Sequence, residues 1–211
     1  MRKFVVDRDY NDMGCNIFKK KTITINEGVT VLVGCNGMGK TTLIKQIIQK
    51  LEKDDIPVVS FDNLKDGGSR AREKFAFYGD ITSLATSFFS SEGENIYLNI
   101  GKFASRIARF AKDNTEANAS EMWIFFDAID SGLSVDNIVE VKEQLFNTII
   151  KTNPNITTYI VVSANEYELA RNANCFDVYN GEYIQFKNYE EYRDFILNSR
   201  KTKDSRVYKD R

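Results

Sequence analysis

Residues 34–42 read Gly34-Cys35-Asn36-Gly37-Met38-Gly39-Lys40-Thr41-Thr42, and they match the phosphate-binding pattern G-x-x-x-x-G-K-[S/T] at every fixed position. The glycines give the backbone enough freedom to wrap its N–H groups around a phosphate. Lys40 places a cation where the β- and γ-phosphates of a nucleotide sit, and the Thr41 hydroxyl is a ligand for Mg²⁺. Every residue of this stretch is therefore a candidate nucleotide-binding residue.

The sequence on both sides of this loop has the pattern that such a loop requires. Residues 29–33 read Val-Thr-Val-Leu-Val, which is typical of a buried strand. Residues 41–50 have apolar side chains at helical spacing, and the positive end of that helix would face a bound anion. Strand, loop and helix thus occur in the order of a phosphate-binding site, and a glycine-rich turn without a ligand is the disfavoured alternative.

The composition indicates an ordinary single-domain protein. The chain has 211 residues, is 42% hydrophobic and 28% charged, and carries a net charge of −1, so it has no overall basic field for nucleic acid or membrane. There is no histidine, which excludes histidine-based catalysis and metal binding. Three cysteines without a C-x-x-C pair favour reduced thiols. With no apolar stretch of membrane-spanning length and no signal peptide, we expect a cytoplasmic location.

Strand-like and helix-like segments alternate along the chain, which predicts an α/β fold with a mostly parallel central sheet. A strand-like start covers residues 3–28, and Asp136 is the expected cap of a helix that runs to residue 150. The remaining expected strands are 56–61, 122–126 and 158–163, followed by a hairpin at 176–186 with its turn at Asn180-Gly181; the remaining expected helices are 95–112 and 189–198.

Asp127 is the candidate carboxylate for Mg²⁺. It follows the continuous apolar run 122–126, and a strand-end acid is where a metal-organising carboxylate of a phosphate-loop protein belongs. The predicted metal ligands are accordingly Thr41 and Asp127.

At this point the chain resembles the ATP-binding cassette superfamily, especially its soluble branch of chromosome-maintenance and double-strand-break-repair ATPases. The phosphate loop has the G-x-N-G-x-G-K-T-T form of that family. Residues 130–134, Asp-Ser-Gly-Leu-Ser, look like its D-loop, and residues 90–94, Ser-Ser-Glu-Gly-Glu, look like a divergent signature motif that retains Ser91 and Gly93. The resemblance implies Mg²⁺ and ATP as cofactors, N- and C-terminal antiparallel strands, and a trimmed helical subdomain.

Three catalytic positions depart from the family pattern. Ala128 stands where the family has the glutamate that activates water, and Asn165 is the nearest replacement for the family's switch histidine. Asp62 or Asn63 occupies the region of a usual glutamine. Three interpretations follow: slow hydrolysis, another acid in the role of base with Asp130 nearest, or an engineered glutamate-to-alanine change. The candidate catalytic residues are Asp127, Asn165 and Asp130.

The resemblance also implies an ATP-dependent, head-to-tail homodimer. Each nucleotide would lie between one subunit's phosphate loop and the other subunit's Ser91 and Gly93, although residues 90–92 also fit a plain helix cap. Tyr10 lies where the family places an aromatic residue that stacks on adenine, with a core or surface aromatic residue as the equal alternative. No heptad pattern predicts a coiled coil.

Two other functions remain open on the sequence. One is a non-hydrolysing, ATP-dependent switch that binds a protein or DNA partner. The other is a nucleotide kinase, which is disfavoured because only Arg70 and Arg72 suggest a lid. We expect an ATP-binding domain at residues 1–198 and a basic tail at 199–211, and such a tail sometimes binds nucleic acid although a solvated terminus is the favoured interpretation.

Overall fold

The computed structural model describes residues 1–9, 15–66 and 92–207. Its strands are β1 (Arg2–Val5), β2 (Thr22–Ile25), β3 (Gly28–Val33), β4 (Val58–Asp62), β5 (Glu121–Asp127), β6 (Thr157–Ser163), β7 (Asn174–Asp177) and β8 (Glu182–Ile184). Its helices are α1 (Lys40–Lys53), α2 (Asn63–Asp66), α5 (Glu92–Glu116), α6 (Val135–Glu140), the π-helical η1 (Val141–Phe146), α7 (Asn147–Thr152), α8 (Tyr167–Ala170) and α9 (Tyr189–Val207).

Six of these strands form one sheet in the order β4-β5-β6-β3-β7-β8. All neighbouring pairs are parallel except β7 and β8, which form the predicted antiparallel hairpin. Strands β1 and β2 make a separate antiparallel pair in which Arg2 lies opposite Ile25. The predicted α/β class with a mostly parallel sheet is confirmed.

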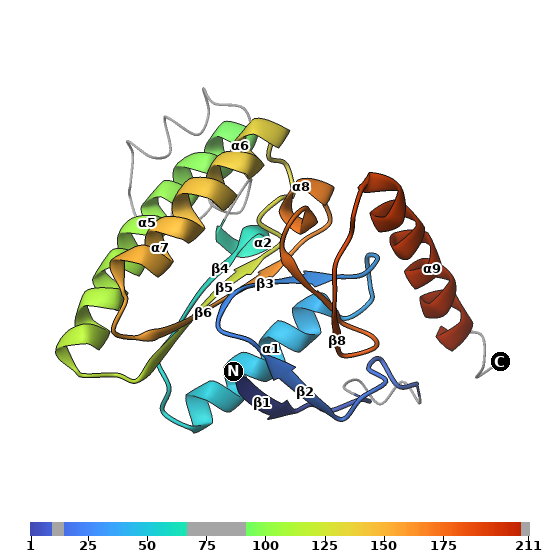
Figure 1. Cartoon of the computed structure of the whole chain (residues 1–211), viewed down its shortest axis with the longest axis horizontal. Helices are drawn as coiled ribbons and strands as arrows, with labels where there is room; N and C mark the ends of the chain where they lie inside the picture. Colours follow the sequence, from blue (N-terminus) through green and yellow to red (C-terminus); the bar gives the residue numbers. More distant parts are fainter. Residues whose placement is uncertain (10–14, 67–91, 208–211) are drawn as a thin grey trace.

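Helices cover both faces of the sheet, as a parallel sheet requires. Figure 1 shows α1 and the β1–β2 pair on one face and α5 with α6–α7 on the other. Trp123 of β5 is fully buried on the α1 side and stacks on Tyr159 of β6 with ring centroids 4.0 Å apart. The opposite side buries Phe103 of α5 against Phe61 and Phe126.

This strand order positions the phosphate loop. The loop follows β3, which lies between β6 and β7, and β6 separates β3 from β5. Residues 34–39 and Asp127 therefore both lie at the carboxyl edge of the sheet, where ligands bind in open parallel sheets.

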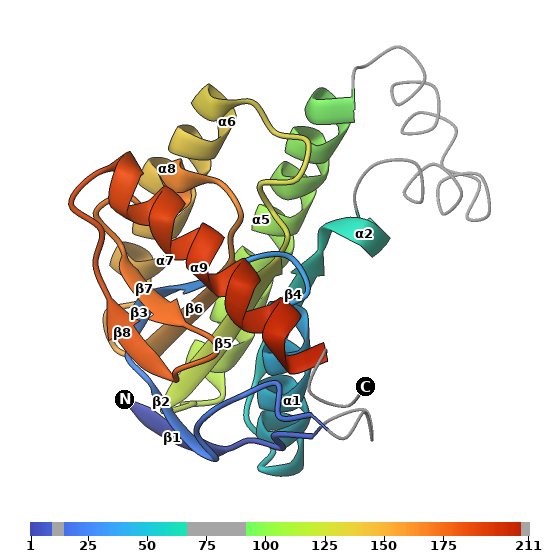
Figure 2. The ribbon, with the colours of Figure 1, turned by 90° about the vertical axis from the view of Figure 1, so that its right-hand side faces the viewer.

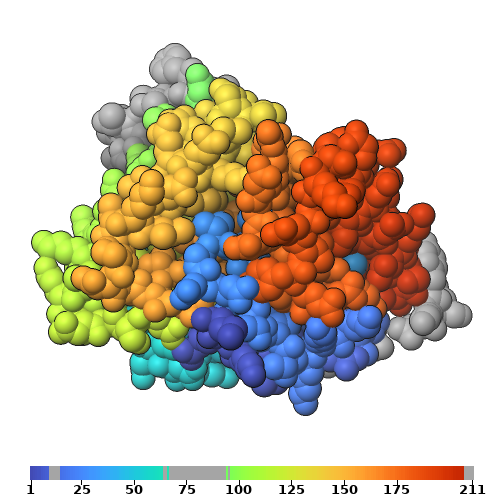
Figure 3. Space-filling view, in the orientation of Figure 1, coloured from blue at the N-terminus to red at the C-terminus, as the bar shows by residue number. Residues whose placement is uncertain are grey.

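Two expected helix boundaries are wrong. The helix expected to be capped by Asp136 begins at Val135 after Ser134, and Asp136 lies in its first turn. The last helix does not end at residue 198 but continues to Val207, so the expected boundary between domain and tail falls inside α9. Figure 3 shows the atoms of α9 in red beside the orange atoms of β7 and β8.

Candidate functional site: the phosphate loop and its neighbours

The phosphate loop has the backbone conformation that glycine permits. Gly34, Gly37 and Gly39 have φ angles of 147°, 78° and 107°. A side chain at Gly39 would also be crowded, because a Cβ there would lie 3.1 Å from the buried Phe18 ring. The loop is thus shaped by positions where any other residue would be strained.

Lys40 is held inside the loop. Its side chain is buried, and its ammonium donates hydrogen bonds to the carbonyl oxygens of Gly34 at 2.6 Å and Cys35 at 3.4 Å. Burial lowers the pKa of Lys40 from its ordinary value, while the nearby charges of Asp130 and Asp127 oppose that shift. A partly desolvated cation in this position attracts an anion more strongly than a solvated one.

Asp127 and Thr41 lie together, as predicted for the metal ligands. The Thr41 hydroxyl donates to Asp127 Oδ1 at 3.1 Å, although β5 and α1 are far apart in sequence. Ser163, at the end of β6, donates to the same oxygen at 2.6 Å and accepts the Ala128 amide at 2.7 Å. Ser163 therefore fixes both the carboxylate and the residue that follows it, and it was not among the predicted site residues.

Ala128 lacks the carboxylate of the family's catalytic glutamate, and its backbone conformation is also unusual. Its φ is 54°, in the left-handed region that residues other than glycine rarely adopt. Asn63 supports this strained segment, since its amide group donates to the carbonyl oxygens of Ala128 at 3.0 Å and Ser131 at 2.7 Å. Asn63 is buried and is thus part of the site's framework.

Asp130 and Asn165 are brought together by a backbone contact. Asp130 is 3% exposed, and its Oδ2 accepts the amides of Asn165 and Glu166 at 2.5 and 2.7 Å. Its Oδ1 has no hydrogen-bond partner among the described residues. Burial raises the pKa of Asp130, against the opposing effects of these two amides and of Lys40. The Asn165 residue is exposed, and its carbonyl oxygen accepts a hydrogen bond from Tyr192.

The other predicted site residues do not join this cluster in the described part of the chain. Tyr10 and Ser91, like Arg70 and Arg72, lie outside the described residues. Gly93 belongs to the first turn of α5, and both Figure 1 and Figure 2 place the beginning of α5 away from the start of α1.

Three side chains of α9 contact the loop and were missed by the sequence analysis. Ser199 accepts the Cys35 amide, Lys203 donates to the Asn36 carbonyl oxygen, and Arg206 contacts the Met38 sulfur. The basic character of this segment was the only signal, and it was interpreted as a solvated tail.

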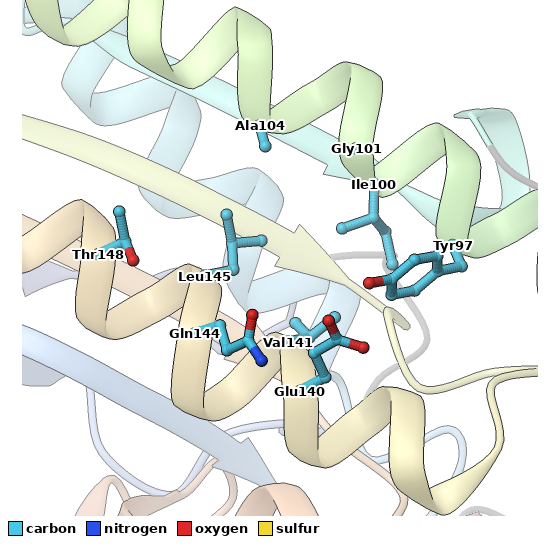
Figure 4. Close-up of a pocket in the computed structure, with 9 residues that line it drawn as sticks. All are labelled: Tyr97, Ile100, Gly101, Ala104, Glu140, Val141, Gln144, Leu145 and Thr148. Atoms are coloured by element: carbon cyan, nitrogen blue, oxygen red, sulfur yellow. The ribbon is translucent and has the colours of Figure 1, made fainter.

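A separate apolar pocket of about 270 Å³ lies between α5 and the α6–η1–α7 segment (Figure 4). Ile100, Ala104 and Leu145 line it, and the Tyr97 hydroxyl, which hydrogen bonds to Glu140, lies at one end. It contains none of the predicted nucleotide-site residues.

The residues present fit a magnesium nucleotide. Mg²⁺ prefers oxygen ligands and is commonly held by one carboxylate, a hydroxyl and the phosphates themselves, and Thr41 and Asp127 offer the first two side by side. The positive-φ glycines leave a loop without side-chain bulk for the phosphates. Among the described residues, no group of three or more acidic or cysteine side chains is placed to hold a metal ion.

In the described residues, no helix is both long and apolar enough to cross a membrane.

Comparison with known proteins also indicates a nucleotide-binding protein. Residues 30–179 match the model of the ATPase family associated with various cellular activities (AAA). The chain is also 36% identical over 97 residues to ABC transporter G family member 23 of Dictyostelium discoideum; the match covers 41% of this chain and only 14% of that relative. With a phosphate loop between β3 and α1 and a family match over most of its length, the chain is a P-loop NTPase that belongs to the AAA family of ATPases.

Proposed function

We propose that this protein binds Mg²⁺-ATP at residues 34–42 and hydrolyses it slowly, with a nucleotide site of the cassette type. The observation that carries the proposal is the convergence of three groups at one edge of the sheet. Lys40 is hydrogen bonded inside the loop, and the Thr41 hydroxyl lies 3.1 Å from the Asp127 carboxylate. The similarity to an ABC transporter of the G family supports the cassette type.

Each of these residues has a defined task in binding. The loop amides and Lys40 would neutralise the phosphates, and Thr41 and Asp127 would hold Mg²⁺, which lowers the charge barrier to phosphoryl transfer when bound. Ser163 keeps Asp127 in place through its 2.6 Å hydrogen bond. Asn165 or Asp130 would position water, since Asp130 Oδ1 has no hydrogen-bond partner among the residues that the structure describes.

Slow turnover follows from Ala128, which carries no carboxylate. General-base assistance is typically worth about 10²–10⁴ in rate. We therefore expect Ala128→Glu to raise turnover by about 10², the lower end of this range, because the left-handed backbone at φ 54° does not point the side chain as an extended backbone would.

Steady-state phosphate release by the wild type and Ala128→Glu tests this expectation. Ala128→Ser serves as the control for adding bulk without a carboxylate. If the wild type already turns over at roughly 10 s⁻¹ or more, the typical enzyme rate, a base other than residue 128 is at work. Loss of that rate in Asp130→Asn would then identify the base.

A non-hydrolysing switch is the second candidate function, and the absent carboxylate at Ala128 is the observation that favours it. In that case ATP would change only the oligomeric state and the affinity for a protein or nucleic-acid partner. Phosphate release no faster than that of Lys40→Ala, together with tight ATP binding, would favour the switch over the ATPase.

A further inference from the structure

Helix α9 presents one continuous face to the edge of the nucleotide site. Tyr192, Ser199, Lys203 and Arg206 follow one another at helical spacing, so they lie along the same side of the helix. Tyr192 contacts the loop after β6, and the other three contact the phosphate loop. Figure 2 shows α9 running across the front of the molecule between α8 and α1.

The first contact holds the peptide unit between Gly34 and Cys35 on both sides. Its N–H donates to the Ser199 hydroxyl at 3.0 Å, and both residues are buried. Its carbonyl oxygen accepts from the Lys40 ammonium at 2.6 Å. Because the two groups of a trans peptide point in opposite directions, Ser199 on one side orients the carbonyl that holds Lys40 on the other.

The second contact acts on the peptide unit between Asn36 and Gly37. Its carbonyl oxygen accepts from the Lys203 ammonium at 3.2 Å, and the Lys203 stem lies 3.5 Å from the position of a Cβ on Gly37. The N–H of this unit therefore points away from α9. The side chain of Lys203 is only 23% exposed, so the contact is partly shielded from water.

The end of the helix is anchored beyond the loop. Arg206 donates to the Ile17 carbonyl oxygen at 2.8 Å, contacts the Met38 sulfur, and lies 4.8 Å from the centroid of the Tyr179 ring. These contacts hold Ser199 and Lys203 against the loop.

We propose that Ser199 and Lys203 are positioning residues of the phosphate site. Helix α9 thus contributes to nucleotide binding by orienting the phosphate loop. Ser199 sets the peptide that holds Lys40, and Lys203 turns the Gly37 N–H away from α9 and into the phosphate cradle. This inference rests on the proposed ATP binding at residues 34–42. A loop that has lost these contacts must be ordered by the nucleotide itself, which costs affinity.

Calorimetric titration of Mg²⁺-ATP into variants of the full chain tests the role of Ser199. We expect Ser199→Ala, which leaves the buried Cys35 amide without an acceptor, to bind about tenfold more weakly. Ser199→Thr keeps the hydroxyl and should bind within about threefold of the wild type. Ser205→Ala removes an exposed hydroxyl from the same helix and should change nothing. Equal binding by the wild type and Ser199→Ala, or equal weakness of the Ala and Thr variants, would overturn the proposal.

Lys203 is tested with a matched pair. Lys203→Met keeps the apolar stem and loses the ammonium, and Lys201→Met makes the same charge change at an exposed position of α9. We expect only Lys203→Met to weaken binding, by about fivefold to tenfold. Equal effects of the two changes would mean that net charge alone is responsible and would contradict the proposal. If Ser199→Ala does not fold, this pair alone decides.

The outcome also separates this inference from the proposed function. Wild-type binding that Lys40→Ala abolishes keeps the proposed function, whatever the α9 variants do. If the wild type does not bind Mg²⁺-ATP, both the proposed function and the inference about α9 are wrong.

Discussion

Asp130 is a buried carboxyl group held by two backbone amides beside a buried lysine. Its Oδ2 accepts the amides of Asn165 and Glu166, and its Oδ1 has no partner among the described residues. Burial raises its pKa above the ordinary value of 3.8, so the folded protein holds this proton more tightly than the unfolded chain does. The charged form accordingly costs stability, and this cost is absent at pH values below the ordinary pKa.

This linkage predicts how Asp130→Asn changes stability with pH. As pH rises from about 4 through the raised pKa of the folded state, the wild type loses stability that the neutral asparagine keeps. We expect the free energy of unfolding of Asp130→Asn, relative to the wild type, to increase over that range. Chemical denaturation at a series of pH values measures it.

The control for this experiment is Asp113→Asn, at an exposed position of α5. Its difference from the wild type should stay constant between pH 4 and 7. A constant difference for Asp130→Asn as well would mean that Asp130 is as well solvated in the folded protein as in the unfolded chain.

For individual residues, the sequence predicts the position of some site residues but not of others. The proximity of Thr41 to Asp127 was predictable, because the phosphate-loop pattern and the strand-end position of the acid specify where each lies; their binding roles stay predictions. The left-handed backbone of Ala128 and the tie between Asp130 and the Asn165 amide depend on contacts between segments distant in sequence. Ser199 was missed for the same reason, since no local pattern connects it with residue 35.

Helix α5 is held on the sheet by the apolar side chains that it buries. Its apolar positions at 96, 100, 103 and 107 recur at helical spacing and are all buried. Phe103 is the largest of them, and its ring lies 5.3 Å from that of Phe126 and 5.4 Å from that of Phe61. The helix therefore packs on the sheet through its isoleucines and through the aromatic cluster around Phe103.

Truncation of this anchor should strongly destabilise the protein. We expect Phe103→Ala to lower the free energy of unfolding by about 3–5 kcal/mol, from lost burial and the cavity left behind. Leu98→Ala removes an apolar side chain that is 46% exposed on the same helix and should cost under about 1 kcal/mol. Similar losses in urea denaturation of the two variants would contradict the packing described for Phe103.

The elements themselves were largely predictable, because strands 122–126 and 158–163 are apolar runs and the helix at 95–112 has apolar residues at helical spacing. Their boundaries shifted by a few residues at most. The clear failure is α9, whose last turns are rich in charge and show no apolar stripe. Its contacts there are polar: Ser199 accepts a hydrogen bond from the phosphate loop, and Lys203 and Arg206 donate to the loop and its neighbours. A hydrophobic pattern does not reveal such contacts.

For the whole molecule, we propose the ATP-dependent homodimer that the family resemblance implies, because it would give the signature-like segment a role. The beginning of α5, which includes residues 92–94 of that segment, lies apart from the start of α1 (Figures 1 and 2). One subunit's segment would thus have to meet the nucleotide of another. The proposal predicts that ATP promotes a dimer and that ADP does not.

Ser91→Arg tests this dimer by adding bulk and charge at the proposed interface. We expect the variant to bind ATP as the wild type does but to remain a monomer in light scattering. Ala117→Arg, at an exposed position in the turn after α5, is the control and should still dimerise. One mass under all nucleotide conditions, in the wild type and in both variants, would rule out the sandwich dimer.

Binding of Mg²⁺-ATP by the phosphate loop is the central claim, and calorimetric titration of wild type, Lys40→Ala and Lys45→Ala tests it most directly. Lys45 lies on the exposed side of α1, so its variant controls for lost charge on the same helix. The wild type and Lys45→Ala should bind alike, and Lys40→Ala should bind roughly 100-fold more weakly or not at all. Equal affinity of Lys40→Ala and the wild type would contradict the account.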